Sequence, residues 1–301
     1  MRTLWPHLSR VTEVTAYAAG LRENEQMSPP GRRQSLIFPR EHGAWGILLV
    51  PLFTGGSVGL LAGGRAGPLA PLTIAVLALF WLRTPLENWM GTVPTKARTA
   101  AELKLVRAAA LILAAISAGA LSWLFWNGQN RELLWIGAIA LAAFAAQAFV
   151  RQARRKARTA AQMAGAAGLT AVAPTAYFVV AGRLNGAAWP LWLLNFAFAA
   201  NQIQFVQLRI RASHVVGRAE KFKLGRKFML AQVILIAFLL AGCAARLWTW
   251  YAAAAFAPVL WRGFAWFVSP FQPLAVHTLG KRELMHAMVF GALLILAFAV
   301  S

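Results

Sequence analysis

The sequence alternates long apolar segments with short polar segments rich in Lys and Arg. An α-helix needs about 20 apolar residues to cross the hydrocarbon core of a bilayer, and most of these segments approach that length. They predict nine membrane-spanning helices, at residues 43–62, 68–83, 104–125, 132–150, 160–181, 188–208, 226–245, 249–268 and 284–300. Pro258 interrupts the eighth segment and predicts a kink or a partly re-entrant turn. The expected fold is an all-α polytopic membrane protein.

The amino-terminal residues lack such an apolar run and mix Arg, Glu, Pro, Gly and Ser. A secretory signal peptide has a longer apolar centre, so residues 1–37 are predicted to be a disordered cytoplasmic tail. Residues 38–301 form the predicted transmembrane helical domain. Met27 would itself be a sensible start, which suggests that residues 1–26 are an extension of the gene prediction with no essential role.

Composition supports a membrane location and limits the partners. The chain has 301 residues, 59% of them hydrophobic and 13% charged, which is too apolar for one soluble core. Lys and Arg number 30 against 9 acidic residues. In a soluble protein this excess would favour nucleic acid as a partner, but between apolar segments the positive-inside rule and anionic lipid headgroups explain it. Membrane lipids, and no nucleic acid, are the predicted partners.

The basic residues are concentrated in alternate loops. Most of them follow the second, fourth and sixth segments, within residues 83–107, 151–158 and 209–227. The loops between carry one arginine each. The positive-inside rule then places the amino terminus and the basic loops in the cytoplasm and the carboxyl terminus outside.

Three titratable residues, Arg40, Glu41 and His42, stand directly before the first apolar segment, which begins near Trp45. Glu41 and His42 are candidates for a gate, a proton relay or half of a metal site. The alternative is structural, because a glutamate in the first turn complements the helix dipole and Arg40 then contacts headgroups. The sequence favours the two readings equally.

A second polar group, LRTPLENWMG, occupies residues 82–91. If the helix continues through Pro85, Arg83 and Glu87 lie four residues apart on one face and can pair. If the helix breaks before the proline, Glu87 and Asn88 belong to the mouth of the loop. A local ion pair worth less than about 1 kcal/mol is the structural alternative.

The sixth segment is the most polar. Asn195, Gln202 and Arg209 are seven residues apart, which at the helical period of about 100° per residue makes one narrow polar stripe. Amides in hydrocarbon are costly without partners. One or two could hydrogen-bond between helices, but five amides leading to Arg209, Arg211 and His214 favour the wall of a wet cavity.

The remaining chemistry is sparse. All nine acidic residues are glutamate, and Cys243 is the single cysteine, so neither an Asp-rich motif nor an internal disulfide can form. Glu283 is expected in the first turn of the last helix, where it would complement the dipole. His277 and His286 lack the spacing of a metal pair. No nucleotide-binding loop, dinucleotide fingerprint or metalloprotease motif that would identify a cofactor occurs.

Four motifs occur in order along the chain: PREHGAWGILLVPL, RTPL, QLRIR and LGKREL. Over most of residues 38–301 the chain resembles the YwiC-like family of bacterial multi-pass membrane proteins. The resemblance implies a location in the bacterial inner membrane and no particular activity.

A more distant likeness is to the UbiA-type intramembrane prenyltransferases, which resemble the chain in layout through nine helices, an internal amino terminus and enlarged cytoplasmic loops after helices two and six. In those enzymes the two loops carry Asp-rich motifs that hold magnesium and an isoprenoid diphosphate. The corresponding positions here are Glu87 and Asn88 in the first loop, and Arg209, Arg211, His214 and Glu220 in the second. Without aspartate, the likeness argues against metal-dependent ionisation and leaves an anionic headgroup held by arginines.

Two hypotheses follow. The first is a protein that binds an isoprenoid or other anionic lipid at a basic cytoplasmic cavity, as a divergent prenyltransferase or a binding protein. It assigns headgroup binding to Arg83, Arg209 and Arg211, proton transfer or cation coordination to Glu41, His42 and Glu87, and cavity lining to Asn195 and Gln202. The second is a transporter or an accessory subunit of a respiratory membrane complex, in which Glu41, His42 and the amides line a path or a docking face.

Overall fold

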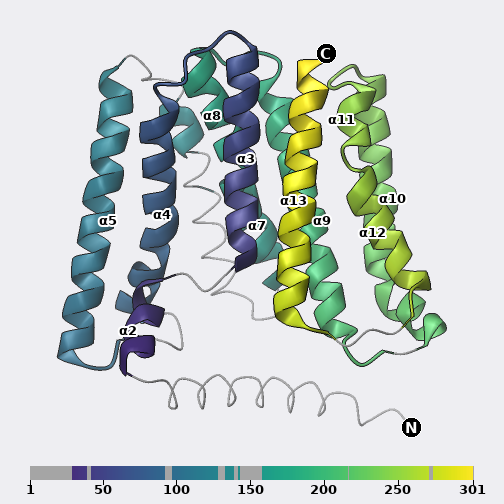
Figure 1. The fold of residues 1–301 in the computed structure, drawn as a ribbon, viewed down its shortest axis with the longest axis horizontal. Coiled ribbons are helices and arrows are strands. Elements are labelled where there is room, and N and C mark those ends of the chain that lie inside the picture. Colours follow the sequence, from purple (N-terminus) through teal and green to yellow (C-terminus); the bar gives the residue numbers. More distant parts are fainter. Residues whose placement is uncertain are drawn as a thin grey trace. The chain divides into compact units, whose positions relative to one another are not determined.

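The computed structural model describes residues 29–38, 42–91, 97–127, 133–138, 142, 158–215, 217–270 and 274–300. All regular structure in this part of the chain is helical (Figure 1). The helices are α2 (Pro29–Ile37), α3 (His42–Leu61), α4 (Leu69–Trp89), α5 (Ala100–Trp126), α7 (Arg158–Thr170), α8 (Val172–Ala181), α9 (Ala188–Arg211), α10 (Arg218–Ala244), α11 (Trp250–Ala254), α12 (Ala257–Val268) and α13 (Val276–Ala299). They fall into two compact units, one of residues 1–40 and 74–122 and the other of residues 41–73 and 123–301.

Within the described residues, six segments are long and apolar enough to span a membrane, and Trp45–Leu61 is a shorter apolar helix. The six are Leu69–Trp89, Ala100–Trp126, Ala160–Ala181, Arg218–Ala244, Trp250–Val268 and Val276–Ala299. This confirms the all-helical, multi-pass character expected from the sequence. Most of the fourth predicted segment, 132–150, lies outside the described residues. The count of nine spans stays a prediction.

In the larger unit, α3 packs closely against both α8 and α13, and glycines make the close approach possible. A Cβ atom at Gly55 would lie 2.0 Å from the carbonyl oxygen of Ala173 in α8. On the α13 side, a Cβ atom at Gly291 would lie 2.9 Å from Val50. In a bilayer, where lipid is as apolar as leucine, association of helices depends on such close packing. These contacts fix the scaffold beside which the remaining helices pack.

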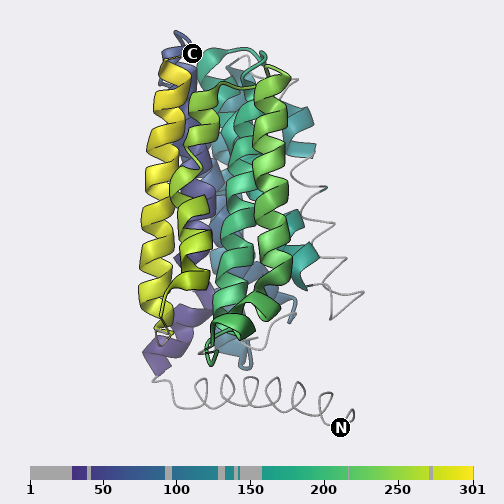
Figure 2. The same ribbon diagram turned by 90° about the vertical axis from the view of Figure 1, so that its right-hand side faces the viewer.

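Helices α9, α10, α12 and α13 run side by side along the same unit (Figure 2). Phe290 of α13 connects two of its neighbours, stacking on Phe198 of α9 at 4.2 Å between ring centroids and contacting Phe256 at 4.9 Å. The eighth predicted segment is divided into α11 and α12, and Pro258 stands at the start of α12. The predicted interruption at Pro258 is confirmed.

Two helices begin earlier than the apolar pattern indicates, and this corrects the role expected for Glu283. Helix α10 begins at Arg218 and α13 at Val276, whereas the predicted segments began at residues 226 and 284. Glu283 therefore lies beyond the first turn of α13, which contains no acidic residue. The polar ends of these helices belong to the packed bundle, so their charged side chains can meet inside it.

In the smaller unit, residues 29–37 form α2, which corrects the expectation of disorder there; residues 1–28 lie outside the described residues. Two contacts explain the order. Trp81 Nε1 donates a hydrogen bond to the carbonyl oxygen of Ile37 at 2.9 Å, and Arg32 Nε pairs with Glu102 Oε1 at 2.6 Å. The hydrogen bond to Glu102 raises the pKa of Arg32, so the guanidinium stays charged. The sequence did not indicate either contact, because each joins residues that are far apart in the chain.

Replacing Gly55 with alanine is expected to lower thermal stability, because α3 would have to move away from α8. Overpacking of this kind costs about 1–3 kcal/mol. Gly280→Ala is the matched control, since nothing lies within 4 Å of a Cβ atom at Gly280 in α13. Unfolding in detergent can be followed by the reaction of the buried Cys243 thiol with a fluorogenic maleimide. Equal melting temperatures for the two variants would contradict the packing role of Gly55.

Candidate functional site

The site is built around an ion pair between α12 and α13. Arg262 Nη1 donates to Glu283 Oε2, and the two side chains are only 10% and 4% exposed. Removing two charges from water costs several kcal/mol per ion unless the charges are paired and their other hydrogen-bonding atoms are used. The pair therefore requires polar partners from the surrounding helices.

Amides from α9 and α10 supply those partners. Arg262 Nη2 donates to Asn201 Oδ1 at 3.0 Å, and Asn201 Nδ2 donates to Gln232 Oε1 at 3.0 Å. Gln202 Nε2 donates to the backbone carbonyl of Glu283 at 2.8 Å. Four helices, α9, α10, α12 and α13, thus share one buried polar network, which we call the ion-pair network.

Two local features hold the arginine and its amide partners in place. The Arg262 guanidinium lies over the ring of Phe205, 4.2 Å from its centroid, in a cation–π contact. The next residue is glycine, and a Cβ atom at Gly263 would lie 2.7 Å from Gln232 Nε2. Because Gly263 has no side chain, Gln232 can approach α12 closely. The network therefore requires a glycine at this position.

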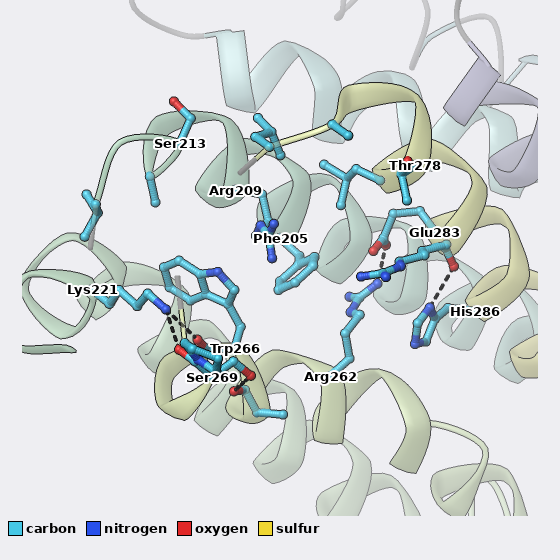
Figure 3. Close-up of a pocket in the computed structure, with 18 of the residues that line it drawn as sticks. Phe205, Arg209, Ser213, Lys221, Arg262, Trp266, Ser269, Thr278, Glu283 and His286 are labelled. Atoms are coloured by element: carbon cyan, nitrogen blue, oxygen red, sulfur yellow. Dashed lines mark hydrogen bonds and ion pairs between the residues drawn. The ribbon is translucent and has the colours of Figure 1, made fainter. Parts of the chain in front are cut away.

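A cavity of about 420 Å³ adjoins the ion pair. It lies among α9, α10, α12 and α13, near the end of the bundle where α9 finishes and α13 begins (Figures 1 and 3). Its charged lining consists of Arg209, Lys221, Arg262, Arg282 and Glu283. Aromatic side chains line it as well, among them Phe205, Trp261 and Trp266. The cavity combines positive charge with apolar surface.

Three of these cations form no ion pair with an acidic residue in the described part of the chain. Lys221 Nζ donates to the backbone carbonyls of Ser269, at 2.7 Å, and Trp266, at 3.4 Å, which are neutral acceptors (Figure 3). Among the described residues, the guanidinium groups of Arg209 and Arg282 form no hydrogen bond or ion pair. Arg209 experiences electrostatic repulsion from Lys221 and Arg282 and a weaker attraction from Glu283, with which it forms no ion pair. We call Arg209, Lys221 and Arg282 the basic triad.

The structure brings only part of the predicted stripe to the cavity. Arg209 lines it, whereas Asn195 and Gln202 are not among its lining residues. Asn195 is buried, and its Nδ2 donates to Thr54 Oγ1 of α3 at 3.1 Å. Gln202 hydrogen-bonds to α13, as described above. Both amides hydrogen-bond to a neighbouring helix, as the structural alternative given for this segment expected.

The next two predicted residues, Arg211 and His214, are exposed and do not line the cavity. Arg211 Nε donates to the carbonyl oxygen of Gln207, one turn earlier in α9, at 3.2 Å. The last turn of α9 therefore directs Arg209 and Arg211 differently, although both follow the same amide-rich segment.

The remaining predicted residues belong elsewhere. Helix α4 continues through Pro85, and Arg83 Nε pairs with Glu87 Oε1 at 3.0 Å, which confirms the first of the two predicted geometries. Asn88 is buried in the smaller unit, where its Nδ2 donates to the carbonyl oxygens of Thr84 at 2.9 Å and Leu36 at 3.2 Å.

The residues before the first apolar segment cannot be compared with the cavity. Glu41 lies outside the described residues, as does the side chain of His42, the first residue of α3. Within the described part of the chain, no group of three or more His, Cys, Asp or Glu residues could hold a metal ion.

The sequence interpretation missed Arg262, the residue on which the network depends. A signal was present, because Arg262 is the one charged residue in the predicted segment 249–268 and ionisable residues inside membrane segments tend to be functional. Gln232 gives a similar signal within α10, where it is fully buried. Lys221 and Arg282 give no signal in the sequence beyond the positive-inside rule.

Comparison with known proteins found one family match, which lies mainly in the first half of the chain. The model of the YwiC-like protein family matches residues 38–177, which confirms the family resemblance over that segment. The motifs QLRIR and LGKREL lie beyond it. No curated protein and no solved structure is detectably similar to the chain. The matched segment extends from before α3 into α8, and the cavity is built from helices that follow it.

Removing one member of the buried ion pair is expected to destabilise the protein strongly. Arg262→Met or Glu283→Leu alone leaves an uncompensated buried charge, which costs about 3–5 kcal/mol, whereas the double variant should recover much of that loss. Glu87→Gln is the matched control, because its pair with Arg83 is more exposed and worth about 1 kcal/mol or less. Denaturant titration in detergent measures the free energies of unfolding. Additive losses in the double variant would contradict the pairing.

Proposed function

We propose that this YwiC-like membrane protein binds the headgroup of an anionic lipid, such as an isoprenoid phosphate, in the basic cavity. The observation that supports the proposal is the basic triad. Arg209, Lys221 and Arg282 line one cavity from three helices. Glu283, the one carboxylate among the described lining residues, is already paired with Arg262. Like charges gathered at a low-dielectric site repel one another, so an anion placed among them is stabilised by all three.

The surroundings of the cavity support a lipid as the source of that anion. Trp261 stands at its edge and is 76% exposed, as suits a side chain that meets lipid. Phe205 and Trp266 add apolar surface beside the cations. Guanidinium groups bind phosphate oxygens through paired hydrogen bonds, and aromatic rings accommodate the first part of an apolar chain. An amphiphile with an anionic headgroup matches both kinds of surface.

We further propose that the cavity opens toward the cytoplasm. Its end of the bundle carries the basic segment 209–227 and Lys281 and Arg282, and the positive-inside rule assigns such segments to the cytoplasmic side. With nine spans, the amino terminus would be inside and the carboxyl terminus outside, in a UbiA-like bundle of the bacterial inner membrane. Anionic lipids of the cytoplasmic leaflet would then reach the site directly.

Some residues predicted from the sequence to belong to the site do not line the cavity. An extension of the proposal gives them a role. In a prenyltransferase-like reaction they would act on a lipid bound at the triad. Headgroup contacts would come from Arg211 and His214, and proton transfer or cation coordination from Glu41 and His42. Arg83, Glu87 and Asn88 belong to the smaller unit, and the roles expected for them stay predictions from the sequence. The binding function itself requires only the triad.

A transporter is the second candidate, favoured by the buried Arg262–Glu283 pair and by the interruption between α11 and α12. Buried ionisable groups and broken helices are common where transporters bind their substrates. A docking role as an accessory subunit of a respiratory complex has no comparable support. Net flux of an anion into proteoliposomes, lost in Arg209→Gln, would favour transport over binding alone.

Lipid binding is expected to depend on the triad. Protein purified in detergent should retain an anionic lipid detectable by mass spectrometry, and Arg209→Gln or Arg282→Gln should reduce its amount about tenfold or more. A charge-assisted hydrogen bond contributes about 1.5–3 kcal/mol, enough for that change. Arg226→Gln is the control, because Arg226 is exposed on α10 and does not line the cavity. An equal lipid content in all four proteins would exclude the proposed site.

The orientation can be tested with single cysteines in a Cys243→Ala background. Arg183 and Lys223 are exposed and lie beyond opposite ends of α9. In intact spheroplasts, Arg183→Cys should react with a membrane-impermeant maleimide, whereas Lys223→Cys should react only after the membrane is opened. The reverse pattern would place the cavity on the outer side.

A further inference from the structure

Resting on the proposed function, we infer that the cavity selects a headgroup with two or more negative charges, a phosphate monoester or a diphosphate, over a phosphodiester. The inference comes from the balance of charges around the cavity and from the hydrogen bonds that its cations have already formed. It narrows the ligand from anionic lipids in general to those with a terminal phosphate.

The charges divide into a neutral pair and an unpaired set. Arg262 and Glu283 neutralise each other, so neither adds net charge to the cavity. The basic triad is left with three positive charges and no carboxylate. A phosphodiester brings a single negative charge, whereas a phosphate monoester carries about −1.5 to −2 at neutral pH and a diphosphate more. Only the terminal phosphates approach the charge of the triad.

The hydrogen-bond donors of the triad also favour a terminal phosphate over a phosphodiester. Arg209 and Arg282 each have a guanidinium without a partner among the described residues, and each can donate two parallel hydrogen bonds to a phosphate. Lys221 has three N–H donors, of which the carbonyls of Ser269 and Trp266 take two. The triad therefore offers donors from α9, α10 and α13. A terminal phosphate has three free oxygens to receive them, and a phosphodiester has two.

The ion-pair network explains why Arg262 is not a fourth binding residue. Its Nη1 donates to Glu283, its Nη2 donates to Asn201, and its face is stacked on Phe205. Arg262 is thus a positioning residue, because it cancels the carboxylate of Glu283, which would otherwise repel a phosphate at the same cavity. Loss of the Glu283 charge should strengthen binding of a multiply charged headgroup, and loss of the Arg262 charge should weaken it.

The test compares two lipids with identical chains. Purified protein in neutral nanodiscs is titrated with dioleoylphosphatidic acid, a phosphate monoester, and with dioleoylphosphatidylglycerol, a phosphodiester. The monoester should bind about tenfold more tightly or better, since each lost charge-assisted contact can change affinity by that factor. Arg209→Gln and Arg282→Gln should each reduce this ratio toward one. Arg226→Gln should leave it unchanged.

Variants of the ion pair test the positioning role. Glu283→Gln should bind the monoester lipid more tightly than the native protein, and Arg262→Gln should bind it more weakly. Each variant is first compared with the native protein by size-exclusion chromatography and by the reactivity of buried Cys243, so that loss of folding is distinguished from loss of binding. Binding of inorganic diphosphate is measured in a separate titration. Binding of diphosphate without any binding of phosphatidic acid would reassign the source of the phosphate to a soluble anion.

The outcomes separate this inference from the proposed function. Equal affinities for the two lipids, both lowered in Arg209→Gln, would overturn the selection by charge and leave the lipid-binding function intact. Absence of binding of every anionic probe to folded protein would overturn both. A preference for the monoester that persists in both Arg209→Gln and Arg282→Gln would place the selection outside the triad and also overturn the inference.

Discussion

A buried ion pair is the constraint on which the candidate site depends. Arg262 and Glu283 come from different helices and are almost fully removed from water. In such surroundings an unpaired donor or acceptor is costly, and the amides of α9 and α10 supply partners for part of the pair. Among the described residues, Arg262 Nε, Gln202 Oε1 and Gln232 Nε2 are buried without a hydrogen bond. The bundle end formed by four helices therefore follows from the cost of two buried charges.

The same pair determines the electrostatics of the cavity. Glu283 is the one carboxylate among the described residues that line it, and its ion pair is formed with Arg262 and not with the other cations. Arg209 is repelled by Lys221 and Arg282, and the attraction of Glu283 for Arg209 offsets only part of this positive charge. The buried ion pair thus leaves an excess of positive charge in the cavity beside it. This arrangement suits the recognition of an anion better than a cavity in which each cation has its own acid.

Scaffold and site occupy different parts of the chain. The match to the YwiC-like family covers residues 38–177, where α3 and α8 approach each other through Gly55. The ion-pair network and the cavity are built mainly from α9 to α13. Helix α13 connects the two parts, because Gly291 receives α3 while Glu283 completes the ion pair. The close glycine packing helps to set the position from which Glu283 reaches α12.

Much of the architecture could be predicted, because the signals for it are local. A bilayer requires apolar segments of fixed length with internally satisfied backbones, so runs of apolar residues indicate helices whatever their neighbours are. Local signals also indicated the interruption near Pro258, and they gave the pairing of Arg83 with Glu87, one turn apart on α4, as one of two geometries. Spacing also identified Asn195, Gln202 and Arg209 as one face of α9.

What that face meets was decided only by the tertiary structure. Asn195 and Gln202 hydrogen-bond to α3 and α13, and only Arg209 reaches the cavity. The partner of Arg262 is equally non-local, since Glu283 belongs to the next long helix and its register depends on how α12 and α13 pack. Periodicity determines which residues share one surface of a helix. The energy of burying charge, and hence the site, depends on which surfaces face each other.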